Sequence, residues 1–537
     1  MAARTIMIQG TGSYVGKSVV TAALCRYFRE EGFRVAPFKA QTMSNNSFVT
    51  TEGGEMGRAQ AFQAQACGIE PCVDMNPILL KPTSDVGAQV LVLGKAVKVM
   101  GAREYHQYQP HLLGVIRESF QRLLQQHDIV VIEGAGSPAE INLRSFDIVN
   151  MATARMASAP VVLVSDINLG GVFAWLVGTL ELLTAEERLL VKAFIINKFR
   201  GDISLLRDGL EFLENRTGKK VLGVLPWVKD LAVSEEDGLP DPKWKGPWVQ
   251  DPAKLQIRVI LLPHISNSTD FESLELEPDV GLRYLADAPQ PGEPLPDLLI
   301  IPGSKSTMAD LEYLRSSGLM DYIHRCHKSG TSVAGICGGY QMLGRKLLDP
   351  LKVESSTASM EGLGLLESTT TFEPEKTTKQ IRALSLDHED EVVGYEIHMG
   401  QTQCGEGTKP RFRIISEGGM AADRFDGAVS AGGSVWGTYL HGVFDAPAFR
   451  RRILNDLRLR RSWAPLPPNS NSHPAKALDS LATLIREHIN LAVLDQILDG
   501  SCLQRSSMKI SSDARSLRDS LSSILRRLAA RAEKPFS

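Results

Sequence analysis

The sequence lacks several features that mark common classes of protein. No apolar run approaches the ~20 residues of a membrane-spanning helix. The first five residues lead almost at once into a predicted strand, so we expect no signal peptide. The seven cysteines are odd in number and widely scattered, which argues against a disulfide framework. These absences predict a cytoplasmic protein in a reducing compartment, with no membrane partner.

A strong net charge is also missing. The 59 basic and 62 acidic side chains leave a net charge of −3, so we expect no bulk electrostatic attraction to nucleic acid. Charged residues make up 23% of the chain and apolar residues 43%, as is ordinary for a globular protein. We find no internal repeat, and the length of 537 residues predicts about two to four domains with ample cores.

The first part of the chain alternates short apolar runs with helix-length segments. Continuously apolar strands separated by helices are typical of a parallel sheet covered on both faces. The predicted strands are 5–9, 35–38, 129–132, 161–165 and 193–197, with a helix at about 17–31. We therefore predict a domain of the doubly wound α/β class over residues 1–232.

A second α/β pattern follows a predicted linker at 233–256, where Pro, Asp, Trp and Gly are frequent. Its predicted strands are 257–262, 298–301, 332–336, 411–415 and 434–439, within a domain at 257–462. Residues 463–500 are predicted to form a Pro-rich hinge and a helix that packs back on this second domain. The Ser- and Arg-rich segment 501–537 predicts either a disordered tail or a loosely docked helix.

A cysteine between glycines is the first candidate for catalysis. Cys337 lies in Gly-Ile-Cys-Gly-Gly directly after predicted strand 332–336. This order is typical of a nucleophile elbow, where small neighbours permit a strained turn that lifts the nucleophile out of the sheet. A lone cysteine is more often a small core residue, so the prediction depends on this context and on a partner base. His441 is the best candidate, because attack needs a thiolate and therefore a proton acceptor.

Backbone N–H groups near Cys337 are candidates for binding a developing oxyanion. Gly303 and Ser304 follow predicted strand 298–301, and their turn can aim N–H groups at the reacting carbonyl. Gly338 would supply the second donor, and Gln341 in the same motif is a candidate contact for the substrate of Cys337. His398 either lines this pocket or makes a structural hydrogen bond.

A glycine-rich turn between a strand and a helix predicts a phosphate site near the N-terminus. Backbone N–H groups of such a loop, together with the helix N-terminus, bind phosphate. The candidate ATP-binding residues of this loop are Gly12, Val15, Gly16, Lys17 and Ser18. Lys17 would neutralise the β and γ phosphates, and the Ser18 hydroxyl would bind Mg²⁺. Counted from Gly10, the spacing is one residue longer than the common Walker A pattern.

Two later strand ends add weaker candidates to this site. Glu133 ends predicted strand 129–132 at the carboxyl edge of the sheet, where ligands bind and where a carboxylate suits Mg²⁺. Alternatively, Glu133 caps the next helix. Asn197 ends another strand and is a candidate contact for the base of ATP.

The motifs together resemble two groups of enzymes. Gln9 to Ser18, Pro37 to Gln41 and Val131 to Ser137 resemble dethiobiotin synthetase and the related amidoligases of corrin biosynthesis. More specific segments resemble the cobyric acid synthase family, and these are Met43 to Ser47, Gly54 to Gln60, Met75 to Pro82 and Ser165 to Phe173. The region around Cys337 resembles the triad class of glutamine amidotransferases, and Gly394 to Gly400 resembles those of corrin biosynthesis. The resemblance covers roughly residues 4 to 490.

The resemblance implies further site residues. Lys39 would be a second cation near the transferred phosphoryl group, and Glu55 a further metal ligand. Corrin contacts are implied for Asn45, Asn46, Arg58 and Gln60. The triad class usually carries a Glu two residues after its His, and here that position is Val443. Cobyric acid synthases also lack this Glu, so the group that orients His441 is left unassigned.

A thiol hydrolase site and a nucleotide site in one chain predict nitrogen transfer. The resemblance implies a glutamine-hydrolysing, ATP-dependent ligase of cobalamin biosynthesis. It would amidate the b, d, e and g carboxylates of adenosylcobyrinic acid a,c-diamide through acyl phosphates. The alternatives are cobyrinic acid a,c-diamide synthase, a nucleotide-switched ATPase of the partition kind, and a regulatory protein with an inactive glutaminase domain. The expected cofactors are ATP and Mg²⁺, with glutamine as nitrogen donor.

Overall fold

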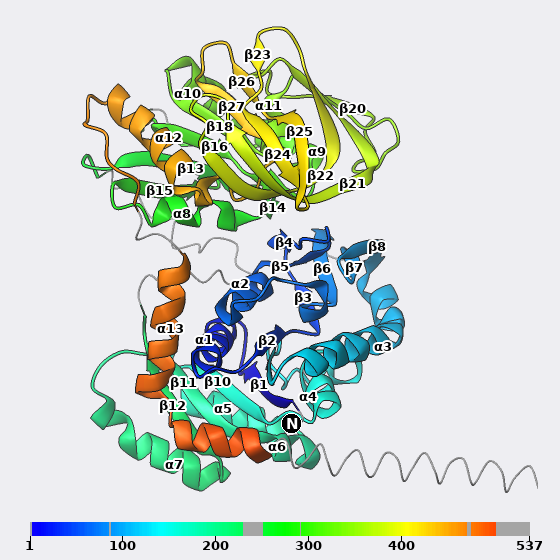
Figure 1. Ribbon diagram of the computed structural model, residues 1–537, viewed down its shortest axis with the longest axis vertical. Helices are drawn as coiled ribbons and strands as arrows, with labels where there is room; N and C mark the ends of the chain where they lie inside the picture. The colour runs from blue at the N-terminus through cyan, green and yellow to red at the C-terminus, as the bar shows by residue number, and fades with distance from the viewer. Residues whose placement is uncertain (1–2, 85–86, 229–250, 290–291, 470–473, 501–537) are drawn as a thin grey trace, which may run out of the picture. The chain divides into compact units, whose positions relative to one another are not determined.

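The computed structural model of the chain divides into two compact units (Figure 1). It describes residues 3–84, 87–228, 251–289, 292–469 and 474–500. Within these ranges, the first unit contains residues 3–38, 117–228 and 481–500, and the second contains 39–116 and 251–480. The predicted linker 233–256 lies largely outside the described residues, and the predicted tail 501–537 lies wholly outside them.

The first unit is built on a six-stranded parallel sheet in the order β12-β11-β10-β1-β9-β2. The strands are β1 (Arg4–Gly10), β2 (Val35–Phe38), β9 (Ile129–Glu133), β10 (Val161–Asp166), β11 (Val191–Phe199) and β12 (Lys220–Pro226). All residues of β2, β9 and β10 are buried, as a sheet covered on both faces requires. The predicted parallel sheet is confirmed.

Helices connect these strands and cover both faces of the sheet. They are α1 (Lys17–Glu30), α3 (Ala102–Gln126), α4 (Met151–Ala157), α5 (Val172–Leu182), α6 (Ala185–Leu190) and α7 (Arg207–Thr217). The chain moves one way from β1 to β2 and the other way from β2 to β9, β10 and beyond. Because such crossovers are right-handed, α1 and the later helices lie on opposite faces. The carboxyl ends of β1, β9 and β10 thereby meet at one edge of the sheet.

The helix predicted near the end of the chain packs on the first unit. In α13 (Pro474–His488), Leu481 and Ile485 are fully buried. Just after the helix, Asn490 donates its backbone N–H to the carbonyl of Leu222 on β12 at 2.8 Å. The prediction that this helix packs on the second domain is therefore wrong. Its apolar spacing indicated a buried face and carried no information about which sheet would cover it.

The second unit contains a seven-stranded sheet in the order β15-β13-β16-β18-β27-β26-β23. Its parallel strands are β13 (Leu255–Ile260), β15 (Val280–Leu285), β16 (Leu298–Ile301), β18 (Ser332–Ile336) and β27 (Val435–Thr438). Two short antiparallel strands, β26 (Ala428–Ser430) and β23 (Thr408–Lys409), extend one edge. The helices of this domain are α8 (Glu272–Glu275), α9 (Thr307–Ser316), α10 (Leu319–Lys328), α11 (Gly338–Leu343) and α12 (Pro447–Arg460).

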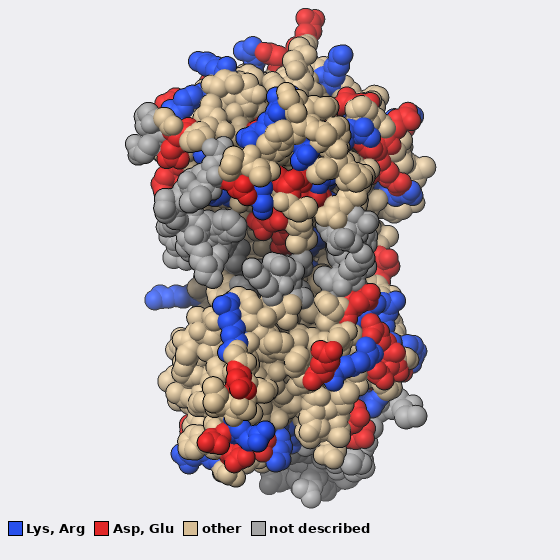
Figure 2. Space-filling model, turned by 90° about the vertical axis from the view of Figure 1, so that its left-hand side faces the viewer, with Lys and Arg blue, Asp and Glu red and all other residues tan. Residues whose placement is uncertain are grey.

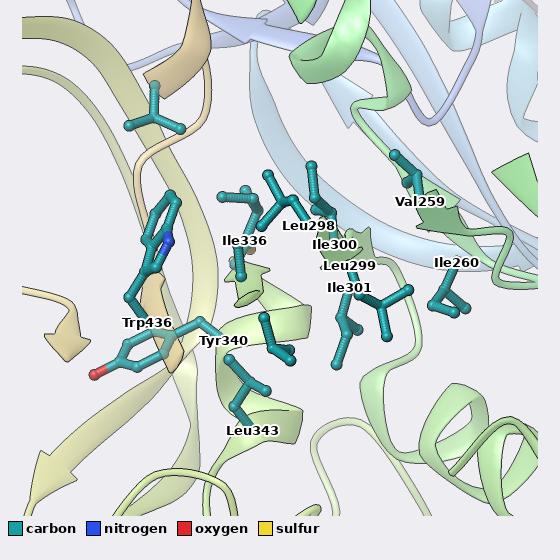
Figure 3. Close-up of a cluster of buried hydrophobic side chains, with 14 of the residues drawn as sticks. Val259, Ile260, Leu298, Leu299, Ile300, Ile301, Ile336, Tyr340, Leu343 and Trp436 are labelled. Carbon is teal, nitrogen blue, oxygen red and sulfur yellow. The ribbon is translucent and has the colours of Figure 1, made fainter. Parts of the chain in front are cut away.

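The core of this sheet holds the segment that carries Cys337. Leu298 to Ile301 on β16 and Ile336 on β18 are fully buried, and Trp436 on β27 packs against the same cluster (Figure 3). Leu343 and Tyr340 of α11 belong to this cluster too. Tight packing on both sides of the β18–α11 turn fixes the turn in place.

A mostly antiparallel sheet in the second unit was not predicted. It consists of β19 (Lys346–Leu348), β20 (Ser359–Glu361), β21 (Ser368–Ser385), β22 (Glu391–Cys404), β24 (Phe412–Glu417) and β25 (Met420–Asp426). Of these strands, only β24 was anticipated. Strands β21 and β22 form the longest pair, with a bulge between Phe372 and Thr377. Their polar, half-exposed sequences give a weak alternating pattern, and this explains why the sequence did not reveal them.

Residues 39–101 form a small β-rich segment of the second unit, called the arm below. Its strands are β3 (Gln41–Met43), β4 (Ser47–Val49), β5 (Glu55–Gly57), β6 (Ile78–Ser84), β7 (Gly87–Val92) and β8 (Lys95–Gly101), and its helix is α2 (Arg58–Cys67). Ser47 donates its N–H to Asn267 Oδ1 at 2.9 Å, and Gln380 Nε2 donates to the carbonyl of Val49 at 3.0 Å. These bonds group the arm with residues far along the chain. The second compact unit therefore includes residues 39–116, which the predicted domain boundary at 232 had assigned to the first domain.

Charge is mixed on the molecular surface. On the face that Figure 2 shows, acidic and basic side chains lie interspersed among neutral ones. Within the described ranges, no helix has both the length and the apolar character needed to cross a membrane.

Candidate active site

The backbone at Cys337 has the strained geometry of an elbow. Cys337 has φ of 50° and ψ of −109°, in a region that residues other than glycine rarely adopt. Its N–H donates to the carbonyl of Thr438 at 2.8 Å, which ties the turn to β27. A Cβ at Gly339 would lie 2.0 Å from the carbonyl oxygen of Ile301, so this position has no room for a side chain. The thiol is therefore held at the carboxyl end of β18.

His441 lies directly after β27, the strand beside β18. Its Nδ1 donates to Asp270 Oδ2 at 2.7 Å, and its side chain also interacts with Cys337. Burial alone would lower the pKa of His441, but the charges of Asp270 and Cys337 outweigh burial and raise it to about 10. The three side chains therefore form a buried thiol–imidazole–carboxylate row.

Asp270 is the group that sequence reasoning missed. It lies in a short 3-10 helix (Ser268–Phe271), is 2% exposed, and also accepts the N–H of Gly442 at 2.9 Å. In the triad class the orienting acid is two residues after the His, whereas here it comes from 171 residues upstream. The sequence carries no spacing that would link these positions, since only the fold brings them together.

The turn after β16 lies beside the thiol and the imidazole. A Cβ at Gly303 would lie 3.1 Å from Cε1 of His441, and a Cβ at Gly338 would lie 2.9 Å from the backbone N of Ser304. Ser304 Oγ donates to the buried Asp310 at 2.6 Å, which fixes this turn. The structure thus brings the predicted oxyanion residues together with Cys337 and His441.

Gln341 is held on the next turn of α11. Its Oε1 accepts from Thr307 Oγ1 at 3.1 Å, and its Nε2 donates to the hydroxyl of Tyr439 at 3.3 Å. With 3% of its surface exposed, Gln341 closes one side of the site. His398 donates from Nδ1 to the carbonyl of Gly400 at 2.8 Å and stacks on Tyr439 with ring centroids 3.8 Å apart.

The predicted phosphate loop lies between β1 and α1. Gly16 is the N-cap of α1 with φ of 96°, and a Cβ there would lie 2.1 Å from Asn197 Nδ2. Lys17 Nζ donates to the carbonyls of Gly12 at 2.9 Å and Gly136 at 3.2 Å, so its cation is held across the loop. This arrangement of helix N-terminus, glycines and lysine can hold a polyphosphate.

Neighbouring strands supply the rest of this loop's contacts. Ser18 Oγ donates to Glu133 Oε1 at 2.8 Å, which brings together the two residues predicted as metal ligands. Asn197 Nδ2 donates to the carbonyl of Val15 at 2.9 Å, so Asn197 supports the loop from β11. That bond uses one of the two N–H groups of the amide, so the contact of Asn197 with the base of ATP stays a prediction.

Lys39 and the predicted corrin residues lie at or beyond the end of β2. Lys39 directly follows β2 and is 1% exposed. Asn46 Oδ1 accepts the N–H of Ser268 at 3.0 Å, and Gln60 Oε1 accepts from Thr42 Oγ1 at 2.9 Å. Within the described part of the chain, Asn45 Oδ1 and Gln60 Nε2 are buried without a hydrogen-bond partner.

Arg58 and Glu55, from the same part of the arm, form ion pairs with other charged side chains. Arg58 Nη2 lies 3.5 Å from Asp445 Oδ2. Glu55 forms ion pairs with both Lys376 and Lys81. Burial alone would raise the pKa of Glu55, but Lys376 and Lys81 hold it well below its usual range. Because two ammonium groups already neutralise this carboxylate, the structure argues against the predicted metal role of Glu55.

Comparisons with known proteins match these two sites. Residues 6–240 match the family model of the CobQ/CobB/MinD/ParA nucleotide-binding domain. Residues 256–449 match that of the CobB/CobQ-like glutamine amidotransferase domain. The fold and both matches place the chain in the class of glutamine-hydrolysing, ATP-dependent ligases.

Curated relatives then define the family within this class. Cobyric acid synthase of Pelotomaculum thermopropionicum is 50% identical over 518 residues, which cover 92% of this chain and 97% of the relative. Cobyric acid synthases of Dehalococcoides mccartyi strain CBDB1 and Streptococcus sanguinis are each 48% identical, over 93% and 92% of this chain and 99% of each relative. The chain therefore belongs to the cobyric acid synthase family, which confirms the predicted family, enzyme class and use of ATP and glutamine.

Proposed function

We propose that the protein amidates the b, d, e and g carboxylates of adenosylcobyrinic acid a,c-diamide. Glutamine supplies the nitrogen and ATP activates each carboxylate. The observation that supports this most strongly is the coexistence of the Cys337–His441–Asp270 row and the Lys17 loop in a chain of the cobyric acid synthase family. The substrate itself is inferred from the activity for which the relatives are named.

In the glutaminase reaction, Cys337 attacks the side-chain amide of glutamine. Cysteine attacks as its thiolate, so His441 accepts the thiol proton, and the raised pKa of His441, about 10, favours the imidazolium that results. The N–H groups of the Gly303 turn and Gly338 stabilise the oxyanion. His441 then gives its proton to the departing ammonia, and water hydrolyses the glutamyl thioester.

Asp270 is the positioning residue of this reaction. Its carboxylate accepts from Nδ1 of His441, so the Nε2 side of the ring is directed at the thiol. It also holds the Gly442 N–H, which fixes the backbone that carries the histidine. We therefore assign to Asp270 the orienting role that Val443 cannot fill.

In the ligase reaction, a corrin carboxylate attacks the γ-phosphate of ATP and ADP leaves. Ammonia then displaces phosphate from the acyl phosphate. Lys17 and Lys39 stabilise the charge that spreads over the phosphoryl oxygens. Ser18 and Glu133 are oxygen donors 2.8 Å apart, a set that suits Mg²⁺. When bound, Mg²⁺ neutralises phosphate charge.

Within the arm, Asn45 and Gln60 are the better candidates for corrin contacts. Each has a buried polar side-chain atom without a partner within the described ranges, whereas Asn46 bonds Ser268 and Arg58 pairs with Asp445.

Ammonia is protonated in water, so we also propose a shielded path between the two reactions. No disulfide joins the six cysteines of the described residues, and we propose a reducing, cytoplasmic location.

Mass spectrometry of the corrin product tests the proposed substrate. The purified protein is incubated with ATP, Mg²⁺, glutamine and adenosylcobyrinic acid a,c-diamide. We expect four successive amidations of the corrin. Hydrolysis of ATP and glutamine without any change in corrin mass would reject this substrate, and amidation of undecorated cobyrinic acid at two positions would identify an a,c-diamide synthase instead.

A further inference from the structure

The arm contacts both segments that support Cys337, and the reaction above gives these contacts no role. One contact lies at the start of the short helix that carries Asp270. The other lies on the aromatic ring that stacks against His441. Both begin at three consecutive residues of the arm, 46–48. A part of the chain far upstream of the glutaminase domain thus reaches the two groups on which the thiol depends.

The first contact is a reciprocal pair of hydrogen bonds from two side-chain amides. Asn46 Oδ1 accepts the N–H of Ser268 at 3.0 Å, and Asn267 Oδ1 accepts the N–H of Ser47 at 2.9 Å. Both asparagines are buried, with 9% and 2% of their surfaces exposed. Such bonds are costly to lose, because a buried backbone N–H would remain without an acceptor. The two amides therefore fix the arm against the start of the 3-10 helix.

The turn at Asn267 determines where Asp270 lies. Asn267 has a left-handed backbone, with φ of 52° and ψ of 46°, and its carbonyl accepts the N–H of Asp270 at 3.0 Å. The 3-10 helix that follows has four residues and few internal hydrogen bonds, so the bonds at its start set its position. A shift of this turn would move the carboxylate away from both His441 Nδ1 and the N–H of Gly442.

The second contact is a series of aromatic rings that ends on His441. Phe48 packs against Tyr395 with ring centroids 5.5 Å apart and an angle of 61° between the ring planes. Tyr395 stacks on His441, with centroids 5.4 Å apart and an angle of 21°. Their backbones also exchange two hydrogen bonds, at 2.9 and 3.2 Å. Because edge-on and stacked rings attract each other, Phe48 holds Tyr395 against the imidazole.

We propose that Asn46 and Phe48 are positioning residues of the glutaminase reaction. Asn46 holds the turn that places Asp270, and Phe48 holds the ring that stacks on His441. Asn46 thereby has a role other than the corrin contact that the resemblance implied. The inference rests on the proposed glutaminase role of Cys337, and it makes the arm a part of the glutaminase site.

A double-mutant cycle tests whether Asn46 acts through Asp270. Glutamine hydrolysis is measured in the full chain for Asn46→Ala, Asp270→Asn and the double variant. We expect Asn46→Ala to lower kcat about tenfold or more with KM for glutamine unchanged, because a small misplacement of the imidazole slows the reaction. In the Asp270→Asn background the same substitution should have no further effect. Equal losses of kcat in both backgrounds would overturn the proposal.

A second variant and a control examine the same contact. Asn267→Gly keeps the left-handed backbone, which glycine adopts readily, and removes the amide that bonds Ser47. It should lower kcat as Asn46→Ala does, so it decides the question if Asn46→Ala fails to fold. Thr83→Ala is the control, because it removes a bond within the arm, from Thr83 Oγ1 to the carbonyl of Gly87 at 3.2 Å. It should match the parent, and an equal loss of kcat there would contradict a specific role of Asn46.

Rescue by a conservative substitution tests Phe48. Phe48→Ala removes the ring that packs on Tyr395, so we expect a lower kcat for glutamine with KM unchanged. Phe48→Leu retains apolar packing at this position and should recover most of the lost kcat. Parent kinetics in Phe48→Ala, or no recovery in Phe48→Leu, would remove Phe48 from the proposal.

Amidation with ammonium salt separates this inference from the proposed function. Asn46→Ala should keep the KM of the parent for the corrin in this assay. A raised KM for the corrin with normal glutamine hydrolysis would make Asn46 an acceptor contact and overturn the inference. If the parent hydrolyses glutamine but does not amidate the corrin, the proposed substrate fails, and the glutamine kinetics still decide the role of Asn46. Glutamine hydrolysis by Cys337→Ala would refute the nucleophile, and this inference with it.

Discussion

At the scale of single residues, the chemistry of the glutaminase site depends on the charge of His441. Three effects determine its pKa. Burial disfavours the cation and lowers the pKa, while Asp270 and Cys337 favour the cation and raise it. The two negative partners prevail because both lie in direct contact with the ring, where little solvent screens them. A fully buried histidine is therefore held as the proton donor that the departing ammonia requires.

Replacing Asp270 by Asn should reduce glutamine hydrolysis and leave ammonia-dependent amidation intact. The amide can no longer hold the imidazolium in its orientation, so we expect kcat for glutamine to fall by about 10²- to 10⁴-fold. Steady-state kinetics with glutamine and with ammonium salt measure both activities. Asp423→Asn, in an exposed ion pair of the same unit, is the control and should match the parent. Full glutaminase activity in Asp270→Asn would show that this residue does not orient His441.

The raised pKa of His441 also predicts how stability changes with pH. The folded protein keeps a proton to about pH 10 that the unfolded chain releases near pH 6.5. This contribution to stability is fully present below about pH 6.5 and is lost as pH rises through about 10. Thermal unfolding at pH 6 and pH 10 should show a larger fall in Tm for the parent than for Asp270→Asn. An equal fall in both proteins would contradict the raised pKa.

At the scale of elements, the β18–α11 turn determines where the thiol lies. Cys337 has a left-handed backbone, and the glycines around it admit the backbones of two neighbouring strands. The motif Gly-x-Cys-x-Gly predicted such a turn, because only glycines permit these approaches. The sequence thus carries enough local information for the elbow and for the Lys17 loop.

Substituting Gly339 by Ala should destabilise the second unit. A methyl group would overlap the carbonyl oxygen of Ile301, 2.0 Å away, so we expect a loss of about 1–3 kcal/mol in the free energy of unfolding. Chemical denaturation measures this loss. Gly114→Ala in α3, where a Cβ meets nothing within 4 Å, is the control and should be neutral or stabilising by about 1 kcal/mol. Equal stability of both variants would contradict the packing at the elbow.

Contacts between distant elements could not be predicted from the sequence. Asp270 reaches His441 from 171 residues upstream, and no spacing rule connects a 3-10 helix after β13 with the end of β27. Likewise, α13 has a clear apolar face, but it packs beside β12 of the first unit and not on the second domain, which directly precedes it in the sequence. The resemblance implied that Glu55 is a metal ligand, and its ion-pair partners Lys81 and Lys376 could not be anticipated because they lie 26 and 321 residues away. In each case tertiary structure, not local pattern, determines the partner.

At the scale of the whole molecule, the chain combines a nucleotide-binding unit with a glutaminase unit that includes the arm. The arm follows β2 in sequence but bonds Asn267 and Gln380 of the second unit. The residues implied in corrin contact therefore belong to the same compact unit as Cys337. Under the proposed function, the contacts to the acceptor and the release of ammonia would therefore belong to one unit of the ligase.

The central claim is that the two chemistries are separable and are linked by ammonia. Product mass spectrometry on Cys337→Ala and Lys17→Ala, each supplied with ATP and the corrin acid, tests it most directly. We expect Cys337→Ala to lose amidation with glutamine and to keep it with ammonium salt. Lys17→Ala should lose amidation with either nitrogen source while Cys337 still hydrolyses glutamine. Failure of ammonium salt to restore amidation in a folded Cys337→Ala protein would contradict the account.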